Sequence, residues 1–185
     1  MAAFATAEDL ASFLQVPTVD RYSAELLLDL ASDAVRDEVH QDIDQATTTE
    51  VYDGLPPGHP WAHVIFLRQV PVTAVSAVVS DGLTLPSSAY EWRGTGTIIS
   101  TFGMFSAYDR GISVTYTHGH APGSRGLATA RSICLQVAAR AYVNPGQVER
   151  ITVGGISREF ARSDPRPGRL ELSEYEKRRL DPLRR

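Results

Sequence analysis

Apolar residues recur at helical spacing in two stretches near the start of the chain. In the first stretch, Leu10, Phe13 and Leu14 fall on one face of a helix. Thr6 can cap this helix at its N-terminus, and Pro17 ends it because proline cannot continue a helix. The pattern therefore predicts a short helix between Thr6 and Pro17.

A second, longer helix is predicted to begin after Thr18 or Asp20, either of which can cap it. Its apolar stripe consists of Leu27, Leu30, Ala31, Ala34, Val35 and Val39. The acidic residues of the same stretch lie off that stripe: Asp29, Asp33, Asp37 and Glu38. Most of the negative charge of this helix is therefore expected on a side that faces solvent.

The middle of the chain consists of short runs in which apolar and polar residues alternate, a pattern typical of half-buried strands. The alternation is strictest in residues 112–117. Asp81-Gly82 has the composition of a hairpin turn, and Gly94-Thr95-Gly96 is predicted to be another turn. The other predicted strands are at 63–68, 70–79, 90–92 and 97–100. Short strands at this spacing favour an antiparallel unit of hairpins.

Two stretches before these strands are predicted to lack regular structure. Residues 41–49 are polar and are predicted to form a loop. Residues 55–60 contain three prolines, which exclude a helix there. The β-rich part is therefore expected to cover about residues 61–120.

Helical spacing returns after this part, where Ser124 can cap a helix with a broad apolar face that ends before Asn144-Pro145-Gly146. Two short β runs around Gly154-Gly155 predict a hairpin over 151–160. A linker rich in Pro, Arg and Gly follows, and Ser173 to Glu176 is a capping box that starts a last short helix.

These elements predict an α+β fold. Two N-terminal helices and a central helix near 124–143 form a small helical bundle, which carries the antiparallel β insertion and ends in a hairpin and a short helix. Residues 1–162 are expected to form the core, and residues 163–185 a linker with a terminal helix. The total of 185 residues is about the length of one domain.

Charge is distributed unevenly along the chain. The overall net charge of −4 is made up of −10 in residues 1–60, zero in 61–120 and +6 in 121–185. Such an asymmetry suggests an interaction role, in which the acidic front of one copy attracts the basic back of another. The alternative is a pair of solvated surfaces, since exposed charge pairs are individually weak.

Residues with catalytic or metal-binding potential do not form a recognisable constellation in the sequence. His118 and His120 have a spacing that suits a metal site on a strand, but no third ligand lies beside them, and a polar turn is the favoured interpretation. Cys134 is the one cysteine and lies on an apolar helix face, so we expect a buried core residue. The sequence therefore predicts neither an enzyme nor a cofactor.

Targeting signals are likewise missing from the sequence pattern. No apolar run approaches the roughly 20 residues of a membrane span. The first residues lack the basic start and apolar stretch of a signal peptide. We therefore expect an intracellular origin and no membrane partner.

The arginines of the C-terminal third suggest phosphate binding as one alternative. Those in the hairpin and linker are Arg158, Arg162, Arg166 and Arg169. Aromatic residues for stacking on bases are scarce there, with only Phe160 and Tyr175. A nucleic-acid-binding accessory protein is thus an open alternative, and a protein–protein surface is another, since arginine is enriched at interfaces.

Taken in chain order, these pieces resemble the head–tail connector proteins (adaptor or head-completion proteins) of long-tailed double-stranded DNA phages. The phrases that carry the resemblance are Arg68-Gln69-Val70-Pro71-Val72-Thr73-Ala74-Val75, Tyr90-Glu91-Trp92 and Val114-Thr115-Tyr116-Thr117-His118-Gly119-His120-Ala121. The resemblance covers nearly the whole chain and rests on the order of the elements and these short phrases. It implies a helical bundle with a β insertion.

For function, the resemblance implies a structural virion protein at the head–tail interface, assembled in the host cytoplasm. Copies would form a ring, usually of twelve, beneath the portal protein. The ring would extend the channel through which DNA passes without sequence readout, and would offer a platform to a stopper or tail-completion protein. No cofactor is implied.

The resemblance also suggests roles for two sets of residues. The C-terminal segment would dock on the portal, with these candidates: Arg166, Arg169, Leu172, Tyr175, Arg178, Arg179 and Leu183. An acidic channel wall would let DNA slide, because phosphate contacts with basic groups bring strong binding. Its candidates are Asp29, Asp33 and Asp37. A loop such as residues 101–110 would meet the next ring or face the channel.

Overall fold

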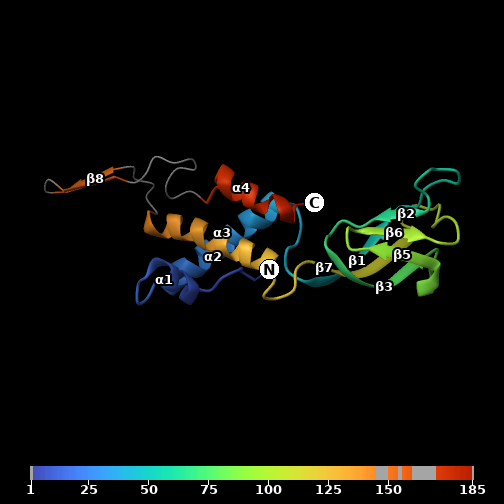
Figure 1. Ribbon diagram of the computed structural model, residues 1–185, viewed down its shortest axis with the longest axis horizontal. Coiled ribbons are helices and arrows are strands. Elements are labelled where there is room, and N and C mark those ends of the chain that lie inside the picture. Colours follow the sequence, from blue (N-terminus) through green and yellow to red (C-terminus); the bar gives the residue numbers. More distant parts are fainter. Residues whose placement is uncertain (1, 145–149, 154–155, 160–169, 185) are drawn as a thin grey trace. The chain divides into compact units, whose positions relative to one another are not determined.

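The computed structural model describes residues 2–144, 150–153, 156–159 and 170–184, the two short pieces of 150–159 by their backbone. The chain divides into two compact units. Met1–His40 and Gly123–Arg184 together form the helical unit, and Gln41–Pro122 forms the β unit. The predicted α+β class is confirmed (Figure 1).

The helical unit contains α1 (Ala7–Leu14), α2 (Arg21–Val39), α3 (Arg125–Val143) and α4 (Glu174–Leu180), followed by a 3-10 turn at Asp181–Leu183. Each helix begins at a side chain that accepts a hydrogen bond from the first turn. These capping residues are Thr6, Asp20, Ser124 and Ser173. The predicted helix starts are therefore confirmed, with Asp20 rather than Thr18 as the cap of α2.

Small residues line the contact between α2 and α3, which pack along one another. Ala24 and Ala31 of α2, and Ala130 and Ala138 of α3, are fully buried. Short side chains let helix axes approach closely, so larger residues such as Leu28 fill the remaining space. α1 contacts both helices, and α4 packs on α3 and α2.

The buried stripe of α2 differs from the predicted one. Leu30 is exposed and Leu27 only partly buried, whereas Leu28, Ser32 and Arg36 are buried. The Ser32 hydroxyl donates to the Leu28 carbonyl at 2.7 Å, and Arg36 donates to the Ala2 carbonyl at 2.7 Å. The Phe4 amide of the N-terminal segment also donates to the Ser32 hydroxyl, at 3.0 Å, so burial here follows hydrogen bonding rather than hydropathy.

The β unit consists of two antiparallel sheets. One sheet has the order β1-β7-β3-β4, and the other has the order β2-β6-β5. The strand bounds are β1 Ala46–Tyr52, β2 Val64–Phe66, β3 Val72–Ser80, β4 Leu83–Thr84, β5 Tyr90–Arg93, β6 Thr97–Ser100 and β7 Ile112–His118. β7 alternates strictly between buried and partly buried residues, which confirms the prediction for 112–117.

Large apolar side chains form the core of the β unit. The fully buried members include Leu67, Ile98, Val114 and Tyr116. The Tyr116 hydroxyl accepts a hydrogen bond from the Gln69 amide at 3.1 Å, which satisfies its polar end inside the core.

The prediction of a loop at 41–49 is wrong for its second half. Residues from Ala46 onward form β1, an edge strand whose exposed face carries threonines. Thr47 and Thr49 share hydrogen bonds of 2.8 Å with Thr117 and Thr115 across the pair. Because threonine favours strands and also solvent, a polar run can form an edge strand. The β unit accordingly begins at Gln41, earlier than the predicted residue 61.

The C-terminal hairpin is confirmed in its two strands, β8 (Arg150–Val153) and β9 (Ile156–Glu159), which pair antiparallel. Its turn at Gly154-Gly155 and the predicted linker at 163–168 lie outside the described residues. A boundary at residue 163 therefore stays a prediction, although α4 beyond it packs within the helical unit.

Candidate functional site

An apolar row lies on the exposed side of α2. Tyr22, Leu26 and Leu30 are 82%, 53% and 44% exposed. They are four residues apart, so they lie on one side of the helix. The periodicity predicted Leu30 in the buried stripe and did not mark Tyr22 or Leu26. The available signal was Leu26-Leu27-Leu28, because three consecutive leucines cannot all lie on one face of a helix.

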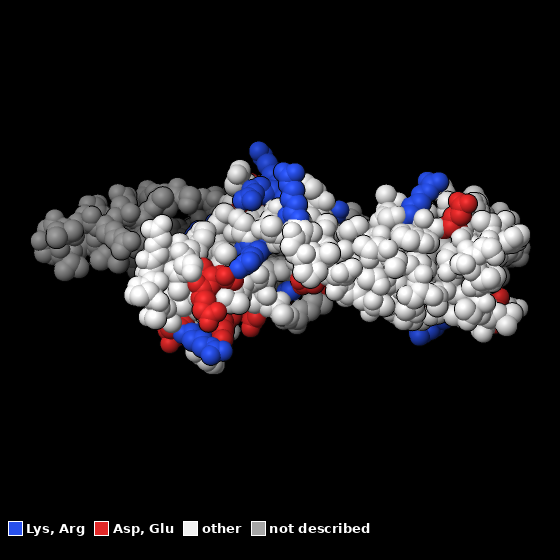
Figure 2. All heavy atoms as spheres, turned by 60° about the horizontal axis from the view of Figure 1, so that its bottom comes forward, with Lys and Arg blue, Asp and Glu red and all other residues white. Residues whose placement is uncertain are grey.

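The three predicted acidic residues share this side of α2. Asp29, Asp33 and Asp37 are all exposed, as the pattern predicted. Only Asp33 has an ion pair among the described residues, a contact of 3.4 Å with Arg36. Figure 2 shows acidic atoms gathered on the part of the helical unit that faces the viewer, with basic atoms along its upper edge.

An open groove of about 640 Å³ runs between α1 and the first half of α2. Its lining combines the acidic residues Glu8, Glu25 and Asp29 with apolar groups such as Val19. Arg21 neutralises part of this charge through an ion pair of 2.7 Å with Glu25. The groove is thus suited to a cationic or amphipathic group.

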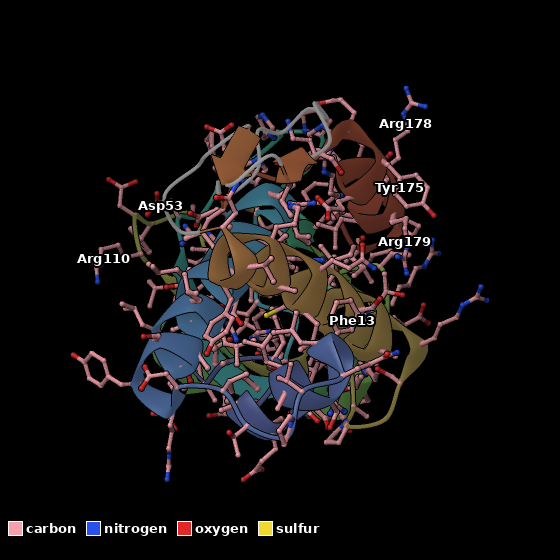
Figure 3. All side chains as sticks on the ribbon, turned by 90° about the vertical axis from the view of Figure 1, so that its left-hand side faces the viewer. Phe13, Asp53, Arg110, Tyr175, Arg178 and Arg179 are labelled. Atoms are coloured by element: carbon pink, nitrogen blue, oxygen red, sulfur yellow. The ribbon has the colours of Figure 1, made fainter. Side chains whose placement is uncertain are left out.

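Three of the predicted docking residues form an accessible surface on α4. Tyr175 is 68% exposed and Arg178 is exposed. The Arg179 guanidinium lies 6.0 Å from the centre of the Tyr175 ring, at the limit of a cation–π contact. Figure 3 shows the three side chains at one side of the helical unit, where they point away from the ribbon.

A buried ion pair holds α4 in place. Arg140 of α3 donates to both carboxylate oxygens of Glu176, at 2.7 and 3.2 Å. The Glu176 carboxylate also accepts hydrogen bonds from the backbone amide and the hydroxyl of Ser173. Glu176 is 2% exposed, so this pair fixes the direction in which the opposite face of α4 points.

Two members of the predicted docking set are buried. Leu172 and Leu183 are buried within the helical unit, in which α4 packs on α3 and α2 and the 3-10 turn packs on α4. Their side chains stabilise α4 against its own chain and are not available to a partner in this state. Arg166 and Arg169 lie outside the described residues.

The paired histidines do not share a site. His118 is fully buried in the β unit, while His120 is partly buried. Neither ring nitrogen of His118 has a hydrogen-bond partner among the described residues, and burial lowers the pKa of its imidazole. No group of three His, Cys, Asp or Glu side chains in the described part of the chain could hold a metal ion.

Cys134 is a core residue, as expected. It is fully buried on α3, and its thiol lies 3.3 Å from the Ser32 hydroxyl. Burial raises the pKa of this thiol, which keeps it protonated and unreactive at neutral pH. Among the described helices, none is long and apolar enough to cross a membrane.

The loop between β6 and β7 carries exposed aromatic side chains. Phe102 and Tyr108 are largely exposed, and Met104 is exposed beside them in sequence. The predicted contact of this loop with another ring, or with the channel, stays a prediction.

Comparisons with known proteins give similarities among solved structures, one of which is described here. No protein-family model matches the chain, and no curated protein matches it. Among solved structures, a chain of the "Neck of empty GTA particle computed with C6 symmetry" is similar over 70% of this chain and 75% of that chain. The TM-score is 0.49 and the sequence identity is 15%.

Proposed function

We propose that this chain is a structural protein of the head–tail interface of a tailed-phage-like particle. Copies would form a ring beneath the portal, join the DNA-filled head to the tail and extend the DNA channel. The role is one of binding and shape, without catalysis. In a dodecameric ring each copy would contact two neighbours, the portal on one side and a stopper or tail-completion protein on the other.

The observation that carries this proposal is the architecture. The sequence resemblance implies a helical bundle with a β insertion, and the chain has this organisation: residues 41–122 interrupt a helical unit that is built from both ends of the chain. The helix, β insertion, helix, hairpin and terminal helix follow in the implied order.

The C-terminal segment supplies the candidate docking surface for the portal. The candidates that remain accessible on α4 are Tyr175, Arg178 and Arg179. Arg166 and Arg169 precede them in the sequence. Arginine and tyrosine are the residue types most enriched where proteins bind each other tightly.

The exposed carboxylates of α2 are the candidates for a channel wall. A negative surface would repel the phosphates of DNA and keep it from binding while it passes. Proteins that grip DNA do the opposite and neutralise phosphates with lysine and arginine.

Ion pairs engage three arginines of the C-terminal third that lie outside the hairpin and linker, which lowers the positive charge that the nucleic-acid-binding alternative can use. Arg131 pairs with Asp9 at 2.6 Å, and Arg140 pairs with Glu176 at 2.7 Å. Arg184 pairs with Glu38 and Asp181. An arginine held by a carboxylate of its own chain contributes little to phosphate binding, since the two charges cancel at a distance.

The test is to produce a tagged copy together with the particle, capture it from lysate and identify the co-purifying proteins by mass spectrometry. We expect portal and stopper or tail proteins. Arg166→Glu/Arg169→Glu should lose the portal, whereas the matched control Arg125→Glu, at an exposed position on α3, should keep it. Recovery of nucleic acid without any particle protein would overturn the proposal.

A further inference from the structure

The exposed side of α2 has the composition of a contact surface. Single exposed apolar residues are common on proteins, but a row of three large ones is a contiguous patch that marks an interaction site. We call Tyr22, Leu26, Leu30, Asp29, Asp33 and Asp37 together the α2 face. It combines an apolar row with carboxylates on the same side of one helix.

We infer that the α2 face binds the α4 surface, defined as Tyr175, Arg178 and Arg179, of a second copy of this chain. The inference rests on the proposed ring and names the contact that builds it. In this inference the neighbouring copy binds the α4 surface, and the linker arginines stay available to the portal. It likewise places the carboxylates of α2 between copies rather than along the channel.

Charge complementarity selects this occupant. Asp29 and Asp37 have no ion pair among the described residues, and Arg178 has none within the same ranges. Each surface therefore carries unneutralised charge of the sign that the other lacks. Opposite charges that meet across an interface speed association and fix its register.

The apolar parts match as well. Tyr175 presents an exposed ring that can pack on the row formed by Leu26 and Leu30. Such a ring with arginines beside it is the composition found at the centre of tight interfaces. The groove of about 640 Å³ beside the α2 face, lined by Glu8, Glu25 and Asp29, can accept a long cationic side chain.

The positions of the two surfaces favour a ring over a closed pair. In Figure 3, α2 begins on the left of the helical unit, and the labelled residues of α4 lie at its upper right. Two different surfaces of one molecule can make head-to-tail contacts, which continue from copy to copy until the rotation closes a circle. A two-fold dimer in which α2 packs on α2 would instead bring the carboxylates of two copies together, which their repulsion opposes.

The exposed leucines of the α2 face distinguish a contact between copies from a channel wall. A channel wall needs the carboxylates but has no use for exposed leucines between them. A contact between copies uses both, because the leucines leave water and the carboxylates meet arginines.

The experiment is a charge exchange on the full chain, followed by sedimentation velocity over a range of protein concentrations. Asp33→Arg/Asp37→Arg should weaken self-association at least about a hundredfold, and Arg178→Glu/Arg179→Glu should do the same, because each places like charges against each other. The four changes combined in one chain should restore association to within about tenfold of the original chain. The matched control Asp109→Arg, an exposed carboxylate of the β unit, should change nothing.

Two outcomes would overturn the inference. One is a chain that stays monomeric at every concentration reached, with the folded state confirmed by circular dichroism. The other is a pair of reversals that weaken association separately but do not rescue each other. Leu26→Ser with Leu30→Ser should give the same loss without any change of charge, which tests the apolar part independently.

Failure here is distinguishable from failure of the proposed function. If captured chains bring portal and tail proteins but the charge exchange does not rescue, the ring uses another contact and the proposed function stands. If the exchange rescues self-association but no particle protein is captured, the contact stands and the proposed function falls.

Discussion

The two units of this chain are stabilised in different ways. The β unit is one continuous stretch with a core of large apolar side chains such as Leu67, Ile98 and Tyr116. The helical unit is assembled from both ends of the chain around small residues, and it depends on buried polar groups such as Ser32 and Glu176. Large apolar cores tolerate change, whereas buried polar contacts fix one geometry and are costly to break.

The difference suggests that the two units have different roles. The helical unit carries the α2 face and the α4 surface, and their mutual orientation depends on how the helices pack. The chain enters and leaves the β unit at neighbouring positions, because the backbone amide of His120 donates a hydrogen bond to the Ile43 carbonyl at 2.8 Å. It can therefore be altered without redirecting either surface of the helical unit.

The largest effect is expected when the two units are separated. With Gln41–Pro122 replaced by a short Gly/Ser linker, the remaining chain should keep its helices and unfold cooperatively. A short linker suffices because Ile43 and His120, each two residues from an end of the β unit, are hydrogen-bonded to each other. Circular dichroism and chemical denaturation measure the result.

The converse experiment sharpens the same comparison. Residues 41–122 alone should fold, since they contain a complete core, and a chain that lacks residues 1–40 should keep the β unit but lose the packing of α3. An excised chain without helical signal would show that the helical unit depends on the β unit.

The next largest effect is expected from Glu176→Ala. The change leaves Arg140 partly buried without its partner and removes the capping box of α4, so we expect a loss of about 3–5 kcal/mol in the free energy of unfolding. Glu174→Ala is the control. Its exposed pair with Lys177 contributes no more than about 1 kcal/mol. Urea denaturation of both variants measures the loss in the free energy of unfolding. Equal losses would contradict the role given to the buried pair.

A smaller loss is expected in the β unit from Gly54→Ala. A methyl group at Gly54 would overlap the carbonyl oxygen of Ser106, where two loops approach. Next to this place the Asp53 carboxylate accepts a hydrogen bond from the Arg110 amide at 2.9 Å, and Figure 3 labels both residues. Overpacking of this kind costs about 1–3 kcal/mol.

Gly94→Ala is the matched control for this change. A methyl group there would lie 3.4 Å from the Val72 carbonyl, at ordinary contact distance, and Gly94, like Gly54, has no positive φ. Thermal unfolding followed by β-sheet signal should separate the two variants. A stable Gly54→Ala would mean that the two loops move apart freely.

The sequence predicted those elements whose signals are local. The caps at Thr6, Ser124 and Ser173 fixed where helices begin, and the alternation of 112–117 fixed β7. β1 was not predicted, because an edge strand of threonines shows no alternation of apolar and polar residues. Its partner, β7, is far away in the sequence.

Burial of polar residues could not be predicted for a similar reason. Ser32 and Arg36 are buried because the N-terminal segment folds back on α2 to bond them, which no periodicity records. This shift of the buried stripe is what leaves Leu30 exposed and creates the α2 face. The burial of Leu172 and Leu183 could not be predicted either, because a leucine beside a short terminal helix gives no sign of whether it meets its own chain or a partner.

The smallest effect is a dependence on pH that should belong to the β unit alone. Burial lowers the pKa of His118 in the folded chain, so the unfolded chain takes up the proton first as the pH falls. The stability from the neutral imidazole is fully present above the unfolded pKa of about 6.5 and is lost as the pH falls below it, toward the folded pKa.

His118→Leu should therefore flatten the stability of the isolated β unit between pH 7 and 5. The control His63→Gln, at an exposed position, should keep the slope of the original chain. Urea denaturation of the isolated β unit at several pH values measures both, and an unchanged slope in His118→Leu would assign the acid sensitivity to the carboxylates. The helical unit contains no buried histidine among its described residues, so a loss of stability from this cause is not expected there.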